Sequence, residues 1–246
     1  MMLNEAELVP YACSPLPNGP WVVFAPHPDD ETFGMGGSLL LAAQQGIDTH
    51  VVFMTDGAEG GDGNKQALIE KRMEEGRRAA DGLGVTTVTF LAEPDRGLQF
   101  NDRVLQRVIA ELDRVHPASV FFPSVLEFHP DHRVTAQLVW KALQQRPALN
   151  AHAYSYEIST HAPANVMIDV TEVAEAKYEI IKIYASQLTQ SKYLALVKAL
   201  DTGRTFSLAM DRTAAEAFFY HEDHSLSLES QLASKIETYF IGLGQG

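Results

Sequence analysis

Few features of this sequence point to a membrane, a disulfide framework or a nucleic-acid partner. Cys13 is the only cysteine in the 246 residues, so neither an internal disulfide nor a zinc site built on cysteine is possible. No apolar run approaches the roughly 18 residues that suggest a membrane span. The first ten residues contain Glu5 and Glu7 and lack the basic segment and apolar core of a signal peptide. We therefore expect a cytoplasmic protein with no stable insertion in a membrane.

Basic residues are also scarce. The chain has 19 lysines and arginines against 32 acidic residues, which gives a net charge of -13. This balance argues against a nucleic-acid partner, because phosphate contacts need clustered Lys and Arg, and it disfavours docking on anionic lipid. A small substrate that is neutral, cationic or held by a few local arginines fits better. The sequence does not fix the oligomeric state, and a homo-oligomer stays an open expectation.

The length and the spacing of apolar runs predict one α/β domain over residues 1–246, with an irregular lead-in over residues 1–20. Strand-like and helix-like stretches alternate along the first part of the chain, which predicts a parallel sheet with helices on both faces. The expected strands are residues 21–25, 49–54, 85–91, 119–122, 153–158 and 166–168. The expected helices are residues 38–45, 64–82, 101–116, a helix after residue 133, and residues 172–185 and 225–240, with Asn64 and Asn101 as two of the N-caps.

The glycine-rich segments exclude a nucleotide cofactor and leave one loop undecided. Gly34, Gly36 and Gly37 do not have the G-x-G-x-x-G spacing of a dinucleotide fingerprint. No G-x-S-x-G motif is present, and Cys13 lacks a strand-end setting, so nucleophilic catalysis has no candidate residue. Residues 57–64 contain four glycines. This segment is expected to form either a mobile lid near the pocket or an ordinary surface loop.

Two turns rich in acids and imidazoles follow apolar runs. The first, residues 24–32, reads Phe-Ala-Pro-His-Pro-Asp-Asp-Glu-Thr, and the second, residues 128–133, reads Phe-His-Pro-Asp-His-Arg. Both lie where a strand passes into a helix, which is the carboxyl end of a parallel strand, where open α/β sheets place their sites. We therefore predict that the two turns meet at one edge of the sheet and form a single site for a divalent metal.

The spacing within these turns suggests a ligand set. His27 and Asp30 are three residues apart, as are His129 and His132. A catalytic zinc site takes three protein ligands and leaves a fourth position for water, so His27, Asp30 and one histidine of the second pair would complete a His₂-carboxylate set. Asp29 then lies beside the metal as a base for water whose pKa falls to about 7.

The remaining histidine of the second pair would face the substrate, where it could stabilise an oxyanion or protonate a leaving group. Asp131, between the two histidines, could orient one of them.

Simpler explanations apply to single features. One histidine with acids in a loop is usually a solvated group or a helix cap, but two such turns at two strand ends make this explanation weak. Glu31 fits a first-turn carboxylate favoured by the helix dipole as well as a catalytic role. The segment 221–224 (His-Glu-Asp-His) has no expected strand before it, and we expect an exposed loop there.

The two motifs together resemble the LmbE-like, or PIG-L, family of metal-dependent N-deacetylases. They are highly specific as a pair, and the resemblance extends over most of the chain. Similar segments occur at Thr55-Asp56-Gly57, Arg72-Met73-Glu74-Glu75, Asp95-Arg96-Gly97-Leu98, Ile168-Asp169-Val170-Thr171, Lys177 and Ser186-Gln187. The resemblance implies a Rossmann-like three-layer α/β/α sandwich with a mostly parallel sheet.

The resemblance also assigns roles that the spacing leaves open. It implies His27, Asp30 and His132 as ligands of Zn²⁺, with Fe²⁺ or another divalent metal as the alternative. It implies Asp29 as the general base, His129 as the oxyanion-stabilising or acid histidine, and Asp131 as its support. The expected substrate contacts are Arg72, Asp95, Arg96 and Glu127. Of these, Arg72 and Asp95 match positions at which family members contact substrate.

Two departures from the family pattern concern the substrate. Glu127 stands at a position where one branch of the family has a tyrosine, and this acid argues against an inositol glycoside as the substrate. Arg96 places a cation in a turn that is often uncharged in the family, which favours an anionic substrate such as a sugar nucleotide or phosphosugar.

The sequence thus predicts a metal-dependent N-deacetylase that hydrolyses the acetamide of an N-acetylated amino sugar or glycoconjugate, a linear amide C–N bond. Another metal-assisted hydrolase, an amidase or a phosphoesterase, is the first alternative, although phosphoesterases more often pair two metals. A non-catalytic glycan-binding protein of the same fold is the second.

Overall fold

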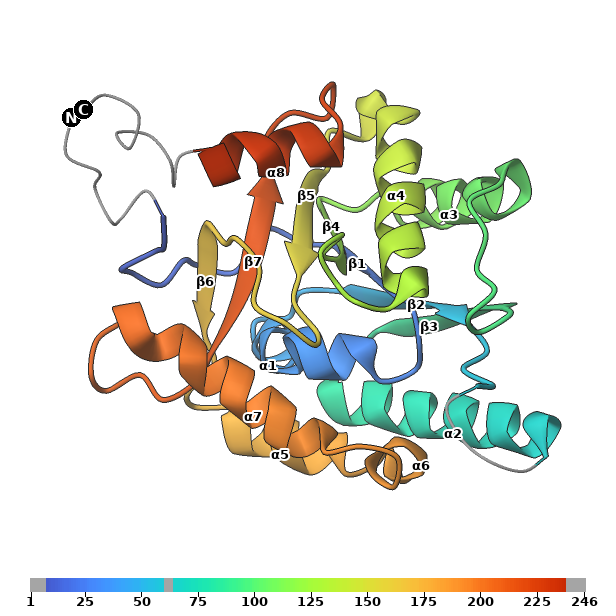
Figure 1. The fold of residues 1–246 in the computed structure, drawn as a ribbon, viewed down its shortest axis with the longest axis horizontal. Coiled ribbons are helices and arrows are strands. Elements are labelled where there is room, and N and C mark those ends of the chain that lie inside the picture. Colours follow the sequence, from blue (N-terminus) through green and yellow to red (C-terminus); the bar gives the residue numbers. More distant parts are fainter. Residues whose placement is uncertain (1–7, 60–63, 238–246) are drawn as a thin grey trace.

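The computed structural model describes residues 8–59 and 64–237 (Figure 1). Within this part of the chain, seven strands form one sheet in the order β3-β2-β1-β4-β5-β7-β6. The strands are β1 (Trp21–Ala25), β2 (Thr49–Thr55), β3 (Thr87–Glu93), β4 (Ser119–Pro123), β5 (His152–Tyr156), β6 (Val166–Asp169) and β7 (Ala215–His221). The five strands from β3 to β5 are parallel, whereas β7 runs antiparallel to both β5 and β6. The sheet is therefore mostly parallel, as predicted.

The strand order changes direction next to β1. From β1 the chain moves outward to β2 and β3, and then returns to place β4 on the other side of β1, with Trp21 beside Ser119. In an open α/β sheet this reversal opens a crevice at the carboxyl ends of the two strands. Both acid-and-imidazole turns follow these two strands.

Helices cover both faces of the sheet and give three layers (Figure 1). One face carries α1 (Asp30–Gln44), α2 (Lys65–Leu83), α5 (Ala174–Ile181) and α7 (Tyr193–Gly203), with the one-turn helix α6 (Ala185–Leu188) at its edge. The other face carries α3 (Asp102–Val115), α4 (Pro130–Gln144) and α8 (Leu228–Glu237). Short 3₁₀ turns occur at Pro147–Leu149 and Arg204–Ser207.

Side-chain alternation along the strands builds one core on each side. In β1, Trp21, Val23 and Ala25 join the core under α1 and α2, whereas Val22 and Phe24 join the core under α3 and α4. A strand has a period of two residues, so a strand buried on both faces reads as one apolar run. This is why β1 and β4, the strands beside the site, read as apolar runs in the sequence.

Both predicted N-caps are confirmed. The Asn64 side chain accepts a hydrogen bond from Gln66 N at 3.0 Å, and the Asn101 side chain accepts one from Val104 N at 3.0 Å. An N-cap side chain satisfies a backbone N–H that has no partner within the helix. The helix α3 ends at His116, which adopts a left-handed conformation with φ 51° before Pro117.

Several predicted boundaries are wrong. The first helix begins at Asp30, not at residue 38, so the glycines that were expected to precede it lie inside it. The strand expected over residues 85–91 is shifted to Thr87–Glu93, and the helix expected over residues 172–185 covers only Ala174–Ile181. The strand β7 and the helix α7 were not expected. The expected end of the last helix, residue 240, lies outside the described residues. Residues 60–63, part of the segment expected to be either a lid or a surface loop, lie outside them too.

The described residues contain no helix that combines the length and the hydropathy needed to cross a membrane.

Candidate metal centre

The two acid-and-imidazole turns meet at the crevice between β1 and β4. His27 follows β1, Asp30 is the first residue of α1, and His132 lies in the first turn of α4. His27 Nδ1 lies 3.0 Å and His132 Nε2 lies 3.3 Å from the same oxygen of Asp30, Oδ2. All three side chains are buried. The structure thus brings together the three residues that were predicted as metal ligands.

This donor set fits a divalent metal. Two imidazole nitrogens and one carboxylate oxygen converge, and donors of a tetrahedral zinc site with bonds of about 2.0–2.1 Å lie roughly 3.3 Å apart. A third imidazole, that of His129, also approaches, because one ring nitrogen from each of His27, His129 and His132 lies within 4.8 Å of the others. A second group, formed by His27, Asp95, His129 and Asp131, also places one ligand atom of each residue within 4.8 Å of the others. The three histidines with Asp95 and Asp131 are therefore the residues that could hold a metal, and Asp30 adds an oxygen 3.0 Å from His27 and 3.3 Å from His132.

Carboxylates stand behind both histidines. His27 Nε2 lies 3.1 Å from Asp95 Oδ1 and 3.3 Å from Asp131 Oδ2. His132 Nδ1 faces Glu127 Oε2 at 3.7 Å, beyond hydrogen-bond distance, and it is a buried atom with no hydrogen-bond partner among the described residues. Ligating histidines usually direct their second nitrogen to a carboxylate, which fixes the tautomer and the ring orientation.

The carboxylates set the charge of these rings. Burial alone would lower the pKa of His27, but its contacts with Asp131, Asp30 and Asp95 outweigh burial and raise the pKa well above its usual range. Burial likewise opposes a charge on His132, but Asp30 and Glu127 raise its pKa to about 9. A site with this much negative potential favours a positive charge, and a metal ion, if bound, would take the place of these protons.

Asp29 is held in an unusual backbone conformation. Its φ of 150° lies in a region that a non-glycine residue rarely adopts, and such conformations cost about 1–3 kcal/mol. Its Oδ2 accepts a hydrogen bond from Arg72 Nη2 at 3.0 Å, and Arg72 also donates to Pro28 O at 3.1 Å and to Gly57 O at 2.9 Å. The turn is therefore fixed by a buried guanidinium.

The electrostatics of Asp29 differ from those of its neighbour. Burial raises the pKa of Asp29 to about 8 even though Arg72 acts to lower it. For Asp30, burial is outweighed by the contacts with His132 and His27, which hold the pKa below its usual range. Adjacent carboxylates with separated pKa values are typical of a site in which one group binds a cation and the other exchanges a proton.

A buried group that sequence reasoning did not assign lies behind Asp29. Glu31 is fully buried, and its Oε1 accepts hydrogen bonds from Tyr184 Oη at 2.5 Å and Thr32 Oγ1 at 2.6 Å. Its Oε2 lies 3.3 Å from Asp29 N, which donates to it. Glu31 is therefore a support for the backbone of Asp29, and the helix-dipole explanation does not account for these contacts.

His129 presents a ring to the open side of the site. Asp131 N donates a hydrogen bond to His129 Nδ1 at 3.3 Å, so the neutral ring carries its proton on Nε2. Burial, followed by the nearby His27 and His132 rings, lowers the pKa of His129. The side chain is therefore a neutral hydrogen-bond donor.

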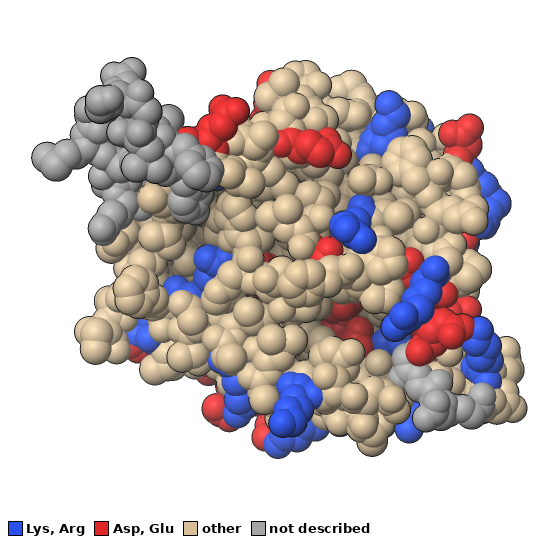
Figure 2. Space-filling view, in the orientation of Figure 1, with Lys and Arg blue, Asp and Glu red and all other residues tan. Residues whose placement is uncertain are grey.

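A cavity of about 410 Å³ opens over the cluster. Figure 2 shows the hollow between α1, α2 and α4, with acidic side chains at its floor. The predicted contacts Arg72, Asp95 and Arg96 all line this cavity. Residues that were not predicted complete the lining, namely Phe33, Glu59, Phe128, Pro130, Ile158, Ser159, Gln187, Tyr193 and Leu196.

Glu127 was also expected to contact substrate, but it does not line this cavity. Its Oε1 accepts hydrogen bonds from Ile158 N at 2.8 Å and Ser159 N at 3.1 Å, while Oε2 faces His132. This position favours a supporting role behind His132 over the predicted contact with substrate.

The segment 221–224 was predicted to be an exposed loop, and this is wrong for its first residue. His221 ends the buried strand β7, and its Nε2 lies 3.1 Å from Ser155 Oγ. Its ring is stacked on that of Phe122 with centroids 5.5 Å apart. The short apolar run over residues 217–220 (Ala-Phe-Phe-Tyr) was the signal that could have revealed this strand. Glu222 and Asp223 are exposed, as expected.

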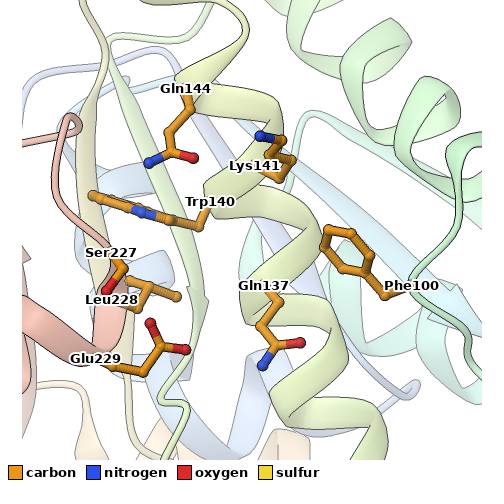
Figure 3. Close-up of a pocket in the computed structure, with 8 residues that line it drawn as sticks. All are labelled: Phe100, Gln137, Trp140, Lys141, Gln144, Ser227, Leu228 and Glu229. Atoms are coloured by element: carbon orange, nitrogen blue, oxygen red, sulfur yellow. The ribbon is translucent and has the colours of Figure 1, made fainter.

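A second cavity, of about 250 Å³, lies between α4 and α8 (Figure 3). Trp140, Leu228 and Phe100 form its apolar walls, and Gln137, Lys141, Gln144, Ser227 and Glu229 add polar groups. It contains no histidine and shares no residue with the cluster. Of these two cavities, the first is therefore the one lined by residues of the candidate metal centre.

The fold and the cluster define an α/β domain with a candidate metal centre at its topological switch point. Residues 22–143, which include both motifs, match the PIG-L family, described as GlcNAc-PI de-N-acetylase. The chain is 30% identical, over 75% of its length and 87% of the relative's, to the probable N-acetyl-alpha-D-glucosaminyl L-malate deacetylase 2 of Bacillus anthracis. The chain belongs to the PIG-L, or LmbE-like, family.

Further comparisons show the range of activities in this family. The N,N'-diacetylchitobiose deacetylase of Pyrococcus horikoshii superposes with a TM-score of 0.73 at 25% identity, over 82% of this chain and 83% of that one. The 4-oxalmesaconate hydratase of Pseudomonas putida is 26% identical over 82% of this chain and 86% of its own length. The relatives thus include deacetylases of N-acetylated sugars and a hydratase.

Proposed function

We propose that this protein is a zinc-dependent N-deacetylase that hydrolyses the acetamide of an N-acetylated amino sugar or glycoconjugate. The observation that carries the proposal is the convergence of His27 Nδ1 and His132 Nε2 on Asp30 Oδ2, with Asp29 beside them at the floor of an open cavity. Two sugar deacetylases among the compared proteins support the acetamide as the reacting group.

His27, Asp30 and His132 would hold the metal. When bound, a divalent ion supplies a Lewis acid for the acetamide carbonyl and lowers the pKa of the attacking water. Asp95 and Asp131 orient His27 through its Nε2, and Glu127 stands behind His132. These carboxylates fix the imidazole tautomers that binding requires.

Asp29 moves the protons. It accepts a proton from the water that attacks the carbonyl carbon, and it returns this proton to the nitrogen of the leaving amine when the C–N bond breaks. Burial raises its pKa to about 8, close to neutral pH, which suits a group that must both accept and donate a proton. Arg72 and Glu31 keep the carboxylate and its backbone in place through the contacts described above.

His129 stabilises the oxyanion. Its lowered pKa keeps the ring neutral, and its Nε2–H donates a hydrogen bond to the oxygen that gains negative charge in the tetrahedral intermediate. Of the two roles predicted for this histidine, the neutral ring favours hydrogen-bond donation over proton transfer to the leaving group.

The test is acetate release from a panel of N-acetylated sugars by protein reconstituted with Zn²⁺. We expect Asp29→Asn to retain the metal and lose about 10²–10⁴-fold in kcat, the range for a general base. We expect His132→Ala to lose the metal as well, by elemental analysis. Near-normal turnover by Asp29→Asn would show that Asp29 is not the base.

The hydratase relative supplies the competing hypothesis, which is addition of water to a C=C bond. Adding an unsaturated polycarboxylate to the panel distinguishes the two. A hydratase would remove the ultraviolet absorbance of this compound and release no acetate from any sugar of the panel.

A further inference from the structure

The cavity over the cluster is lined by two arginines in contrasting settings. Arg72 is buried, and its guanidinium donates to Gly57 O, Pro28 O and Asp29 Oδ2. Arg96 is exposed, and its guanidinium has no hydrogen bond or ion pair with any residue in 8–59 or 64–237. Arg72 is therefore committed to the protein, whereas none of the five N–H donors of the Arg96 guanidinium is used by a residue in the described ranges.

The backbone of Arg96 is fixed to the centre even though its side chain is not. Arg96 N donates a hydrogen bond to Asp131 Oδ2 at 2.7 Å, and the preceding residue contacts His27 through Asp95 Oδ1 at 3.1 Å. The residue has a φ of 56°, a left-handed conformation in which glycine would be free of strain. The turn thus carries a cationic side chain to the rim at a position where backbone conformation alone favours glycine.

The rest of the rim makes this cation distinctive. Besides Arg96, the titratable groups in the lining are the acids Asp29, Asp30, Glu59 and Asp95, the histidines of the centre (His27, His129 and His132) and the committed Arg72. The histidines belong to the centre at the floor, so at the rim Arg96 is the described lining cation that could attract an anionic group of a ligand. A guanidinium binds carboxylate and phosphate groups through two parallel hydrogen bonds.

The position of Arg96 indicates which part of a ligand it would meet. The acetamide must lie at the floor, beside Asp29 and His132, for hydrolysis to occur. Phe128, the first residue of the second motif, lines the same cavity and is 75% exposed, so it offers an aromatic face to a sugar ring at the rim. Arg96 then faces the part of the substrate that is remote from the acetamide.

We propose that the substrate carries an anionic group, a carboxylate or a phosphate, on the part of the molecule remote from the acetamide, and that Arg96 binds this group. This inference rests on the proposed deacetylase function. It makes Arg96 a residue that determines specificity and leaves the bond-breaking chemistry to the centre.

The experiment compares three substrates that share the N-acetylglucosamine ring. These are the neutral methyl glycoside, the malyl glycoside with two carboxylates, and the 1-phosphate. Acetate release gives kcat/KM for each with the wild-type chain, with Arg96→Gln, and with Arg133→Gln. Arg133 is the matched control, because it is the last residue of the second motif, is exposed on α4 and does not line the cavity.

We expect the wild-type chain to prefer an anionic substrate over the neutral one. Arg96→Gln should reduce the anionic-to-neutral ratio of kcat/KM about tenfold, the lower range for a hydrogen bond to a charged group. Arg133→Gln should leave the ratio unchanged, and 0.5 M salt should shrink the effect of Arg96→Gln because the guanidinium is exposed. A larger loss of kcat/KM for the malyl glycoside on Arg96→Gln replacement would identify a carboxylate as the bound group. A larger loss for the 1-phosphate would identify a phosphate.

Calorimetric binding of the same three compounds to the Asp29→Asn protein, with and without Arg96→Gln, separates this inference from the proposed function. A ratio and a binding constant that do not respond to Arg96→Gln would overturn the inference, even if acetate is released from every substrate. Anion binding that depends on Arg96, without acetate release from any substrate, would support the anion site and overturn the deacetylase.

Discussion

The sharpest stability prediction concerns a buried cation far from the metal centre in sequence. Lys177 on α5 is fully buried, and its Nζ lies 2.9 Å from Asp201 Oδ2 and 2.8 Å from Glu216 Oε1. Glu216 in turn accepts hydrogen bonds from Gly37 N at 2.8 Å and Ser38 N at 2.7 Å in α1. Burial opposes the charge on Lys177, but the two carboxylates raise its pKa, so the ion is retained.

Replacement of Lys177 by Met keeps most of the volume and removes the charge. Two buried carboxylates then face each other without a cation, and loss of one partner of a buried ion pair destabilises by about 3–5 kcal/mol. For a chain of about this size, each kcal/mol lowers Tm by roughly 2–4 °C. We therefore expect Lys177→Met to lower Tm by about 6–20 °C in a calorimetric scan.

Two further variants make the reasoning testable. Lys182→Met is the matched control, because Lys182 at the end of the same helix is half exposed and pairs with Glu179 at 2.5 Å on the surface, where such pairs contribute at most about 1 kcal/mol. Adding Asp201→Asn to Lys177→Met should recover part of the loss, since it neutralises one of the two stranded carboxylates. If Lys177→Met changes Tm no more than Lys182→Met does, the buried cluster does not stabilise the fold.

Two other predictions concern groups whose roles follow from burial. Tyr184→Phe removes the hydroxyl that donates to Glu31 and so loosens the backbone of Asp29. We expect kcat to fall about tenfold, the effect of losing one hydrogen bond to a charged group, while the metal content stays unchanged. An unchanged kcat would contradict this role of Tyr184. Burial lowers the pKa of His221 to about 3, so between about pH 6.5 and pH 3 the unfolded chain binds a proton that the folded chain does not, and stability falls as pH falls. Urea unfolding from pH 7 to pH 5 should show that His221→Gln reduces this slope by up to about 1.4 kcal/mol per pH unit, and identical slopes would refute the assignment.

The centre of the site was predictable from the sequence because both motifs are local. Each turn follows an apolar run directly, and the rule that parallel strands place their carboxyl ends at one edge brings His27 and His132 together without further information. The same locality explains why Asn64 and Asn101 were identified as caps, since a capping side chain reaches only two or three residues along the chain.

The groups that support the centre could not be predicted in this way. Tyr184 reaches Glu31 across 153 positions of sequence, and Glu216 reaches Gly37 across 179. Both contacts depend on where α5, α6 and β7 lie on the sheet, and β7 itself was missed. Its antiparallel placement between β5 and β6 breaks the alternation of strand and helix on which the sequence prediction relied.

The first helix shows why a sound local rule failed at the most important element. Glycine disfavours a helix by about 1 kcal/mol relative to alanine, so the first helix was expected to begin only after Gly34, Gly36 and Gly37, at residue 38. In the structure α1 runs through all three, with a kink at Met35 where φ is -149°. A Cβ at Gly34 would lie 2.4 Å from the carbonyl oxygen of Glu157, and one at Gly37 would lie 2.7 Å from Val170 Cβ.

Close approach, and not backbone freedom, therefore selects glycine at Gly34 and Gly37. The helix can begin at Asp30 and still cross the sheet in contact with the end of β5, because neither glycine has a side chain to hold it away. Glu216 then accepts the backbone N–H groups of Gly37 and Ser38, directly after the kink, and this offsets part of the helix propensity that glycine loses. The contacts that the glycines allow thus place Asp30 where both histidines can reach one of its oxygens.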